Sequence, residues 1–289
     1  MLLSELLQLA AGELEKAGIE EFAFEARFLL GACLGKTRTE LFLQSEVEVG
    51  VTDQAKYLSF ISRRKKREPA AYILGEQEFW SMPFSVTPAV LIPRPETEFL
   101  LERVLALVAP ENLHKGALLD LCCGSGVIAA VLAKETGENI IASDISSLAL
   151  QVARSNLCRH GLLGQVALVE ADLFSTFRPF REFSLIVSNP PYVSRFDLEN
   201  NLEPEVAVFE PKVALDGGRG GMDFILRIRQ QMAKYLCPGG QLFMEVGADQ
   251  GDAVYKLFTE GLKDSPGFEK VDIFVDYAGR DRVLHAQIG

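Results

Sequence analysis

The chain has 289 residues, of which 48% are hydrophobic, and its mean hydropathy is +0.13. It is long enough for one large domain or for a large and a small one, and its apolar content can fill a core. The net charge of −11 and the pI of about 4.9 oppose a broad duplex-binding surface, because neutralising phosphates requires an excess of Lys and Arg.

The composition also argues against several kinds of site. Five cysteines are an odd number, they form no paired CxxC spacing, and only three histidines occur, so neither a disulfide framework nor a zinc site is indicated. The N-terminus lacks a basic n-region, and no apolar run reaches membrane-spanning length. We expect a cytoplasmic monomer with no metal, no membrane partner and no stable nucleic-acid partner.

The first part of the chain has a helical pattern. Apolar residues recur at helical spacing from Leu3 to Leu14 and again from Phe22 to Cys33. Asp53 is expected to cap a further helix that ends near Pro69. The basic run 63–67 is interpreted as a solvated helix end, with docking to an acidic partner or ribosomal RNA as the alternative. A small helical domain is therefore expected over residues 1–75.

The pattern then changes to that of an α/β domain. Short aromatic and β-branched runs, broken at residues 81–83, predict a β-hairpin linker over 76–94. After Pro95 a helix is expected to reach Val108. Alternating buried strands and helices predict a Rossmann-like domain with a seven-stranded, mostly parallel sheet over 95–289. Strands are expected at 117–121, 139–143, 166–170, 184–188, 241–246, 269–275 and 282–287, and helices at 126–135, 146–160, 222–236 and 250–262.

A tight turn after the first of these strands marks a cofactor site. The strand runs directly into Cys122-Cys123-Gly124-Ser125-Gly126, which opens a helix, and ligands of nucleotide type bind at this place. Asp144 closes the next strand, where a carboxylate can accept from both ribose hydroxyls. Asp172, Leu173 and Phe174 follow the third strand and are expected to flank the adenine. Contacts with the cofactor are expected from Asp120, Cys122, Cys123, Gly124, Ser125, Gly126, Asp144, Ile145, Asp172, Phe174 and Asn189.

The turn does not identify the cofactor by itself. It lacks the full GxGxxG spacing that brings a helix N-terminus to a pyrophosphate, so a sulfonium cofactor, S-adenosylmethionine, is favoured over a nicotinamide cofactor. Asp120 has an alternative role as a carboxylate that caps backbone N–H groups of its own loop. Cys122 and Cys123 are interpreted as packing residues rather than nucleophiles, since no histidine stands near them in sequence.

The catalytic site is expected at Asn189-Pro190-Pro191-Tyr192, directly after an apolar strand. The two prolines stiffen this loop, so that the Asn189 side-chain oxygen and the Pro190 carbonyl are two preset acceptors for an NH2 group. Tyr192 would stack on the flat acceptor. Positioning and electrostatics would then carry the catalysis without a general base. The alternative is a proline-rich surface turn.

These motifs resemble those of the PrmC/HemK family of release-factor glutamine methyltransferases, over nearly the whole chain. The family's NPPY loop corresponds to Asn189-Pro190-Pro191-Tyr192. The more family-specific RPETE string stands at Arg94-Pro95-Glu96-Thr97-Glu98. Further matches lie at residues 71–75, 78–80, 209–211, 214–218 and 278–282. One departure is Cys122, where the family usually has glycine, and a side chain there is expected to crowd the methionine tail of the cofactor.

The resemblance implies a substrate and several site roles. It implies an N-terminal domain that recognises the release factor and a transfer from S-adenosylmethionine, leaving S-adenosylhomocysteine, to the glutamine of that factor's Gly-Gly-Gln tip. Substrate contacts are expected from Asn189, Pro190, Pro191, Tyr192, Arg94 and Glu210. A hinge salt bridge is the alternative for Arg94, and a plain connection is the alternative to a substrate lid for 217–221.

Other functions stay open. A ribosomal-protein glutamine methyltransferase would share the chemistry, and an adenine-amine methyltransferase acting on nucleic acid would share the NPPY loop. A scaffold that keeps the fold without catalysis is disfavoured by the intact loop, and a redox protein is disfavoured by the lack of redox-cofactor motifs.

Overall fold

The computed structural model describes residues 1–108, 113, 116–180, 182–260 and 268–289. The chain divides into two compact units, which are described separately. Unit 1 comprises Met1–Glu76 together with Glu203–Phe209, and unit 2 comprises Gln77–Leu202 and Glu210–Gly289. No helix in the described residues is both long enough and apolar enough to span a membrane.

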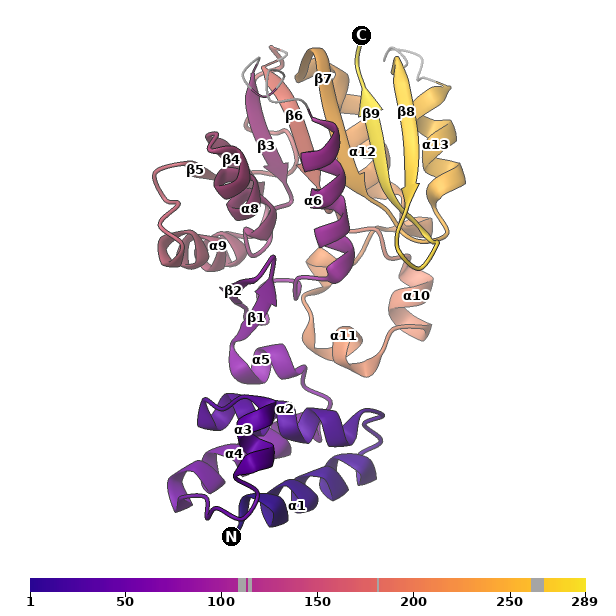
Figure 1. Ribbon diagram of the computed structural model, residues 1–289. Coiled ribbons are helices and arrows are strands. Elements are labelled where there is room, and N and C mark those ends of the chain that lie inside the picture. The colour runs from indigo at the N-terminus through magenta and orange to yellow at the C-terminus, as the bar shows by residue number, and fades with distance from the viewer. Residues whose placement is uncertain (109–112, 114–115, 181, 261–267) are drawn as a thin grey trace. The chain divides into compact units, whose positions relative to one another are not determined.

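Unit 1 is helical, as its apolar spacing predicts (Figure 1). Its helices are α1 (Leu3–Lys16), α2 (Phe22–Leu34), α3 (Arg38–Leu43), α4 (Val51–Arg64), α5 (Ala70–Leu74) and α11 (Pro204–Phe209). Leu6, Leu14 and Leu30 are fully buried in its core, and Tyr57 adds a buried hydroxyl that donates to the Ala26 carbonyl at 2.9 Å. The sequence missed α3, although Thr37 and Glu40 form a capping box at its start.

Two details of the first helices differ from expectation. Gly50 rather than Asp53 is the N-cap of α4, and Asp53 lies in the first turn, where its negative charge still favours the helix dipole. The segment 203–209, which follows the NPPY loop in sequence, belongs to unit 1 rather than to the α/β domain. The spacing of residues along the chain does not predict that this segment belongs to unit 1.

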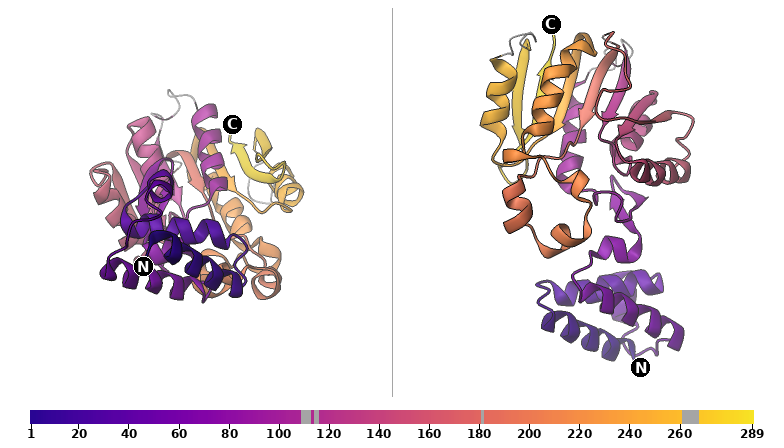
Figure 2. Two further views of the ribbon diagram at one scale, coloured as in Figure 1. Left: turned by 60° about the horizontal axis from the view of Figure 1, so that its bottom comes forward. Right: turned by 180° about the vertical axis from the view of Figure 1, so that it is seen from behind.

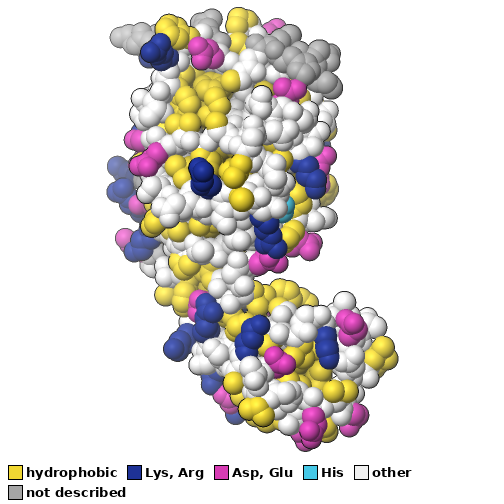
Figure 3. Space-filling model, turned by 90° about the vertical axis from the view of Figure 1, so that its left-hand side faces the viewer, with side chains coloured by type: hydrophobic (Ala, Val, Ile, Leu, Met, Phe, Trp, Pro, Cys, Tyr) yellow, Lys and Arg dark blue, Asp and Glu magenta, His cyan; other side chains and the backbone are white. Residues whose placement is uncertain are grey.

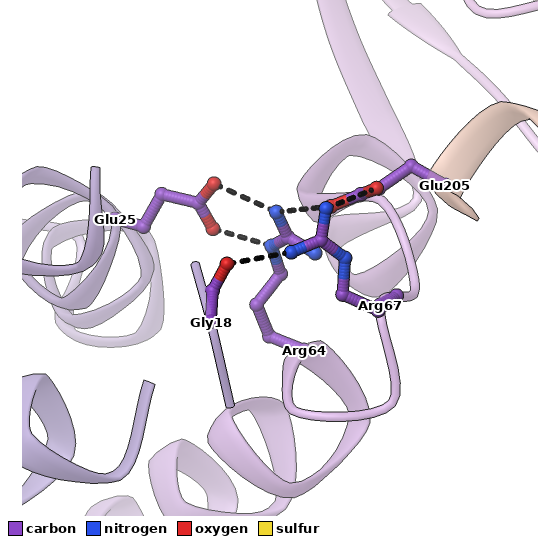
Figure 4. A network of polar contacts seen from close by, with 5 residues as sticks. All are labelled: Gly18, Glu25, Arg64, Arg67 and Glu205. Atoms are coloured by element: carbon purple, nitrogen blue, oxygen red, sulfur yellow. Dashed lines mark hydrogen bonds and ion pairs between the residues drawn. The ribbon is translucent and has the colours of Figure 1, made fainter. Parts of the chain in front are cut away.

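Arg64 and Arg67 of the basic run 63–67 form ion pairs inside unit 1 (Figure 4). The interpretation as a solvated helix end was therefore wrong for them, whereas Lys65 and Lys66 are exposed. Arg64 is 6% exposed and lies between the carboxylates of Glu25 and Glu205. Arg67 donates to Glu205 at 2.9 Å and to the Gly18 carbonyl at 2.9 Å. These ion pairs hold the segment 203–209 on the helices of unit 1.

A β-hairpin opens unit 2. It consists of β1 (Glu76–Phe79) and β2 (Met82–Ser85), which form a two-stranded sheet. The turn lies at Trp80 and Ser81, with φ of 53° and 55°, which is one position earlier than the expected break at 81–83. The Trp80 backbone N–H donates to Glu98, so the hairpin is tied to the next helix of its own unit.

The rest of unit 2 is the expected α/β fold around a seven-stranded sheet, which is confirmed. The strand order is β5-β4-β3-β6-β7-β9-β8, and only β9 runs antiparallel to its neighbours. Its strands are β3 (Ala117–Leu121), β4 (Ile140–Asp144), β5 (Val166–Glu170), β6 (Phe183–Ser188), β7 (Leu236–Glu245), β8 (Lys270–Val275) and β9 (Asp281–Gln287). Its helices of nine or more residues are α6 (Pro95–Leu107), α8 (Val127–Thr136), α9 (Ser147–Arg159), α12 (Asp223–Gln231) and α13 (Gly251–Thr259), and the shorter α10 (Arg195–Asn200) follows the NPPY loop.

The sheet separates two apolar cores, because successive strand residues point to opposite faces. In β6, Leu185 and Val187 join one core and Ile186 joins the other. Helices α6 and α8 cover the first face, and α12 and α13 cover the second, as Figures 1 and 2 show from opposite sides. A parallel sheet covered on both faces leaves its carboxyl edge as the place for a ligand.

The helix expected at 222–236 is shorter than predicted. Helix α12 ends at Gln231, and after a 3₁₀ turn β7 begins at Leu236, five positions before the expected strand. The register between β6 and β7 shifts at this point, where Pro238 and two glycines bulge the strand. The end of the expected helix 250–262 lies outside the described residues.

The ion pairs of Glu205 are expected to stabilise the segment 203–209. In Glu205→Gln the acceptor for Arg64 and Arg67 loses its charge, so we expect the segment 203–209 to exchange its backbone hydrogens roughly tenfold faster. Hydrogen exchange followed by mass spectrometry measures this. Glu203→Gln, the same change at an exposed position of the same segment, is the control. Equal exchange in the two variants would contradict a holding role for Glu205.

Candidate active site

A pocket lies in unit 2 at the carboxyl ends of β3, β4 and β6. It has about 970 Å³ of empty space, which includes the open solvent at its mouth. It is lined by Ala89, Val90, Leu91, Pro93, Thr97, Leu121, Cys122, Cys123, Gly124, Ser125, Val127, Ile128, Ser143, Asp144, Ile145, Ser146, Ala149, Ala171, Asp172, Leu173, Asn189, Pro191, Val213, Ala214 and Phe224. The predicted turn, the acidic strand ends and the NPPY loop therefore meet at one cavity.

The turn after β3 forms the floor of this pocket. Cys122 has a φ of 66° and Gly124 a φ of 52°, and the Cys123 N–H donates to the Ser143 carbonyl at the end of β4. A left-handed conformation at Cys122 is the kind that glycine adopts without strain. Burial raises the pKa of the Cys122 thiol above its usual value, with Asp144 and Asp120 adding to the effect, which opposes a role as thiolate nucleophile.

Asp144 stands at the pocket wall, as expected of a ribose-binding carboxylate. Its Oδ2 accepts from the Gly124 N–H at 2.8 Å, and its Oδ1 accepts from the Ser146 N–H at 2.9 Å. These bonds fix the carboxylate in place, and each oxygen keeps a further lone pair for a ligand hydroxyl. Burial raises its pKa.

The loop after β5 contributes differently from expectation. Asp172 and Leu173 line the pocket, and Asp172 also pairs with Arg227 at 2.7 Å. Phe174 does not line it: the ring is fully buried in the core and stacks on Tyr235 at 4.4 Å between centroids. Leu173, with a φ of 50°, is 3% exposed and belongs to the same apolar core as Phe174, but it also lines the pocket. This corrects the expected cofactor contact of Phe174.

Two further expected cofactor contacts are corrected. Asp120 is 0% exposed and does not line the pocket, and its Oδ2 accepts from the Ala129 N–H at 2.9 Å, so it caps the start of α8 instead. Gly126, with a φ of 80°, also lies away from the pocket. A Cβ there would lie 3.0 Å from the Cβ of Ala153, so glycine permits α8 and α9 to pack.

The NPPY loop brings Asn189 and Pro191 to the pocket. The Asn189 Nδ2 donates to the Thr97 hydroxyl at 3.1 Å, while no described residue donates to its Oδ1. Pro190 is buried and is not part of the lining, so the role of its carbonyl stays a prediction. The loop thus presents one side-chain acceptor at the pocket.

Tyr192 is held firmly from behind. Its hydroxyl donates to Glu245 at 2.8 Å, and its carbonyl accepts from Gln250 at 2.9 Å. A Cβ at Gly217 would lie 2.7 Å from the Tyr192 Cα, and one at Gly221 would lie 2.1 Å from its carbonyl oxygen. Gly217 and Gly221 therefore let the chain pack against this loop, and the substrate-lid role of 217–221 stays a prediction.

Arg94 and Glu210 form an ion pair within unit 2. Glu210 is 4% exposed and also accepts from the Ile92 N–H at 3.3 Å. Burial raises the Glu210 pKa, and the Arg94 charge opposes that shift. The pair matches the salt-bridge alternative for Arg94, and substrate contact by either residue stays a prediction.

Sequence reasoning missed several residues of the site. Thr97 and Glu245 lie behind Asn189 and Tyr192, and Phe224 adds an aromatic wall. Thr97 belongs to the RPETE string, so it was recognised as part of a motif but was assigned no role. Glu245 had no signal of its own, because only strand pairing brings the end of β7 to this place.

Two family descriptions match the chain. "PrmC N-terminal domain" matches residues 5–75, and "Methyltransferase small domain" matches residues 96–212. Release factor glutamine methyltransferases are among its relatives. That of Koribacter versatilis is 42% identical over 98% of this chain and 98% of its own length, and that of Geobacter sulfurreducens is 40% identical over 99% and 96%.

Solved structures show the same fold at low sequence identity. The hMettl16 catalytic domain in complex with the MAT2A 3'UTR hairpin 1 is 13% identical, with a TM-score of 0.55 over 86% of this chain and 85% of that one. The T. Thermophilus 16S rRNA N2 G1207 methyltransferase (RsmC) in complex with AdoMet and guanosine is 18% identical, with a TM-score of 0.51 over 74% and 50%. At this identity the likeness concerns the fold alone.

The conformation of Cys122 leads to a test. Cys122→Gly removes left-handed strain of about 1–2 kcal/mol and adds unfolded-chain entropy of about 0.5–1 kcal/mol, so stability should stay within about 1 kcal/mol of the original. It also clears a side chain from the pocket wall, so cofactor binding should tighten. Cys122→Val should cost about 1–3 kcal/mol. Denaturant unfolding and calorimetric titration measure both, and a valine variant as stable as the glycine one would contradict the argument.

The buried Asp120 predicts a pH dependence. Burial raises its pKa to about 8 from 3.8, so between these values the folded protein holds a proton that the unfolded chain releases. Its contribution to stability therefore falls as pH rises through this window. Asp120→Asn keeps an acceptor for Ala129 and does not titrate, so its unfolding free energy should fall less between about pH 5 and about pH 8. Parallel curves for the two proteins would show that Asp120 is already ionised.

Proposed function

Since the chain belongs to the family of release factor glutamine methyltransferases, we propose that it methylates the side-chain amide of the glutamine in the Gly-Gly-Gln motif of a peptide chain release factor. The observation that carries the proposal is the state of Asn189: its NH2 group is held by Thr97, and its oxygen is left at the pocket wall as an acceptor. An acceptor for N–H groups is what an NH2 substrate requires.

The residues of the pocket fit S-adenosylmethionine. When bound, this cofactor supplies a methyl group activated by a sulfonium. Asp144 would hold the ribose hydroxyls, since its oxygens are fixed by backbone donors and keep free lone pairs. Ile145, which is 51% exposed, and Leu173 both line the pocket and offer apolar surface for a flat base. Cys123, Gly124 and Ser125 would border the amino-acid part.

The NPPY loop would prepare the amide nitrogen. This nitrogen is a poor nucleophile because its lone pair is delocalised into the carbonyl. Asn189 Oδ1 and the Pro190 carbonyl would each accept one of its hydrogens, which fixes its orientation and draws electron density onto nitrogen. This nitrogen would accept the methyl group that the bound cofactor supplies and would give up one N–H proton to solvent. Catalysis rests on orientation rather than on a general base.

Tyr192 would set the plane of the acceptor. Its hydroxyl is bound to Glu245 and its backbone carbonyl to Gln250, so the ring is anchored at its hydroxyl and the backbone that carries it is fixed. A ring fixed in this way can stack on a flat amide and restrict its rotation. Loss of the ring would therefore affect turnover more than cofactor binding.

Unit 1 offers a surface for a protein partner. Phe24 and Phe28 are 56% and 46% exposed and stack in parallel at 6.1 Å, and Phe42 and Leu43 are 80% and 75% exposed. Exposed apolar side chains of this size in one small unit are typical of interaction sites. They support recognition of the release factor by this unit. The proposal also includes action as a monomer in the cytoplasm. All five cysteines are free, which suits a reducing compartment.

Two alternatives share the chemistry. A nucleic-acid amine acceptor is disfavoured by the net charge of −11. On the face drawn in Figure 3, Lys and Arg side chains are interspersed with Asp and Glu rather than gathered into one basic field. A ribosomal-protein glutamine would use the same loop and differs only in the docking surface.

The acceptor is tested by transfer of labelled methyl from S-adenosylmethionine to purified release factor. A release factor whose Gly-Gly-Gln glutamine is replaced is run beside it. We expect label on the unaltered factor alone. Label on neither, with cofactor bound, would direct the search to ribosomal protein, and label on both would place the acceptor at another residue.

Asn189→Ala tests the loop. Removing one of two preset acceptors should lower kcat about 10²- to 10³-fold, as removal of one oxyanion-hole donor does. Cofactor affinity should change little, because Asp144 and the turn after β3 supply most of that contact. Single-turnover transfer and calorimetric titration measure the two quantities. Undiminished transfer by a folded Asn189→Ala protein would rule out the proposed role.

A further inference from the structure

A buried carboxylate lies behind the NPPY loop. Glu245 ends β7 and is 1% exposed. Its Oε2 accepts from the Thr97 hydroxyl at 2.7 Å, and its Oε1 accepts from the Tyr192 hydroxyl at 2.8 Å. Thr97 Oγ1 accepts in turn from Asn189 Nδ2 at 3.1 Å. One carboxylate is thus linked to both polar side chains of the loop.

The direction of these bonds follows from the available protons. A threonine hydroxyl has one proton, and Thr97 gives it to Glu245. The Thr97 oxygen can then only accept from Asn189, which must offer its NH2 group. The Asn189 oxygen is consequently left for the pocket. If the Asn189 amide were turned by 180°, its NH2 group would lie at the pocket, where the substrate needs an acceptor. Its oxygen would then face Thr97, which has no proton left to donate.

We propose that Glu245 is a positioning residue for methyl transfer: through Thr97 it fixes the Asn189 amide with its oxygen toward the acceptor NH2 group, and it anchors the Tyr192 ring by its hydroxyl. The inference rests on the proposed function for the identity of the acceptor. It extends that function by assigning the orientation of the catalytic amide to a residue that touches neither substrate nor cofactor.

The surroundings bear on the charge of Glu245. Burial raises its pKa, while the hydrogen bonds from Thr97 and Tyr192 and the charge of Arg282 on β9 oppose the shift, and Glu96 on α6 adds to it. Only the ionised form accepts from both hydroxyls without a competing proton. A proton on Oε2 would point at Thr97, whose own proton would then turn to Asn189 and favour the reversed amide. Wild-type kcat at saturating cofactor should therefore fall toward acid pH.

Glu245→Gln is the direct test, because it keeps the shape of the side chain and places a donor where an acceptor stood. We expect kcat to fall roughly 10²-fold, as for loss of one preorganised group, with cofactor Kd within about twofold. The acid limb of the kcat profile should disappear in this variant. A folded Glu245→Gln protein with wild-type kcat and the same pH profile would overturn the proposal.

Thr97 supplies a matched pair in case Glu245→Gln does not fold. Thr97→Ser keeps the hydroxyl and should retain about a third or more of kcat, whereas Thr97→Val keeps the volume and should lose roughly 10²-fold. The double variant Glu245→Gln/Thr97→Val should be no worse than Glu245→Gln alone, because Thr97→Val breaks a chain of bonds that Glu245→Gln has already broken. Equal losses in the serine and valine variants would indicate packing alone and overturn the relay.

A readout without turnover separates this inference from the proposed acceptor. In protein labelled with ¹⁵N at asparagine, the Asn189 side-chain NH2 signal is identified by its loss in Asn189→Ala. It should show a nuclear Overhauser contact with the Thr97 methyl group in the wild type and lose it in Glu245→Gln. If that contact is present and lost as expected but release factor is not methylated, only the acceptor is wrong. If the contact is absent from the wild type, the positioning role is wrong.

Discussion

The parallel register of three strands is the constraint on which the site depends. Leu121 of β3 pairs with Ser143 of β4 on one side and with Ser188 of β6 on the other, so the residues after all three strands emerge at the same level. The turn at Cys122, the carboxylate of Asp144 and the amide of Asn189 follow within one residue of these partners. A one-residue slip of β6 would direct Asn189 to the opposite face and separate it from the cofactor turn. Burial of both sheet faces in apolar cores is what prevents that slip.

The site is stiff on the side away from the pocket. Behind the NPPY loop lie a carboxylate, a threonine, a glutamine and two glycines that approach the backbone so closely that no Cβ fits. Toward the pocket the lining is mainly apolar and offers few polar atoms. This division suits a reaction in which the protein supplies no proton-transfer group. What it must supply is a fixed acceptor geometry, and fixed geometry is costly to build unless each side chain is held by a neighbour.

The sequence predicted the fold class and the meeting of the turn, Asp144 and Asn189, because these follow from periodicity and from chemistry at strand ends. It failed where packing decides between adjacent residues. Phe174 and Leu173 are both apolar and lie in the same core, but only Leu173 also lines the pocket, and the sequence does not distinguish them. Asp120 and Asp144 are both acidic at strand ends, and burial separates them. The position of Glu245 and the membership of 203–209 in unit 1 depend on contacts between residues far apart in sequence. Local sequence patterns do not predict such contacts.

The membership of residues 203–209 in unit 1 affects how the protein folds during its synthesis. Arg64 meets Glu205 across 141 positions of sequence, so the helices of unit 1 leave the ribosome long before the residue that completes their ion pairs. In the interval Glu25 is the carboxylate partner that Arg64 has among the described residues of the N-terminal helices, and unit 1 still lacks α11. Domains generally fold in the order of their synthesis, but here unit 1 is complete only after residues 203–209 have been synthesised. Folding of the helical unit is therefore coupled to emergence of the NPPY segment, and a chain truncated before residue 203 would carry an incomplete first domain.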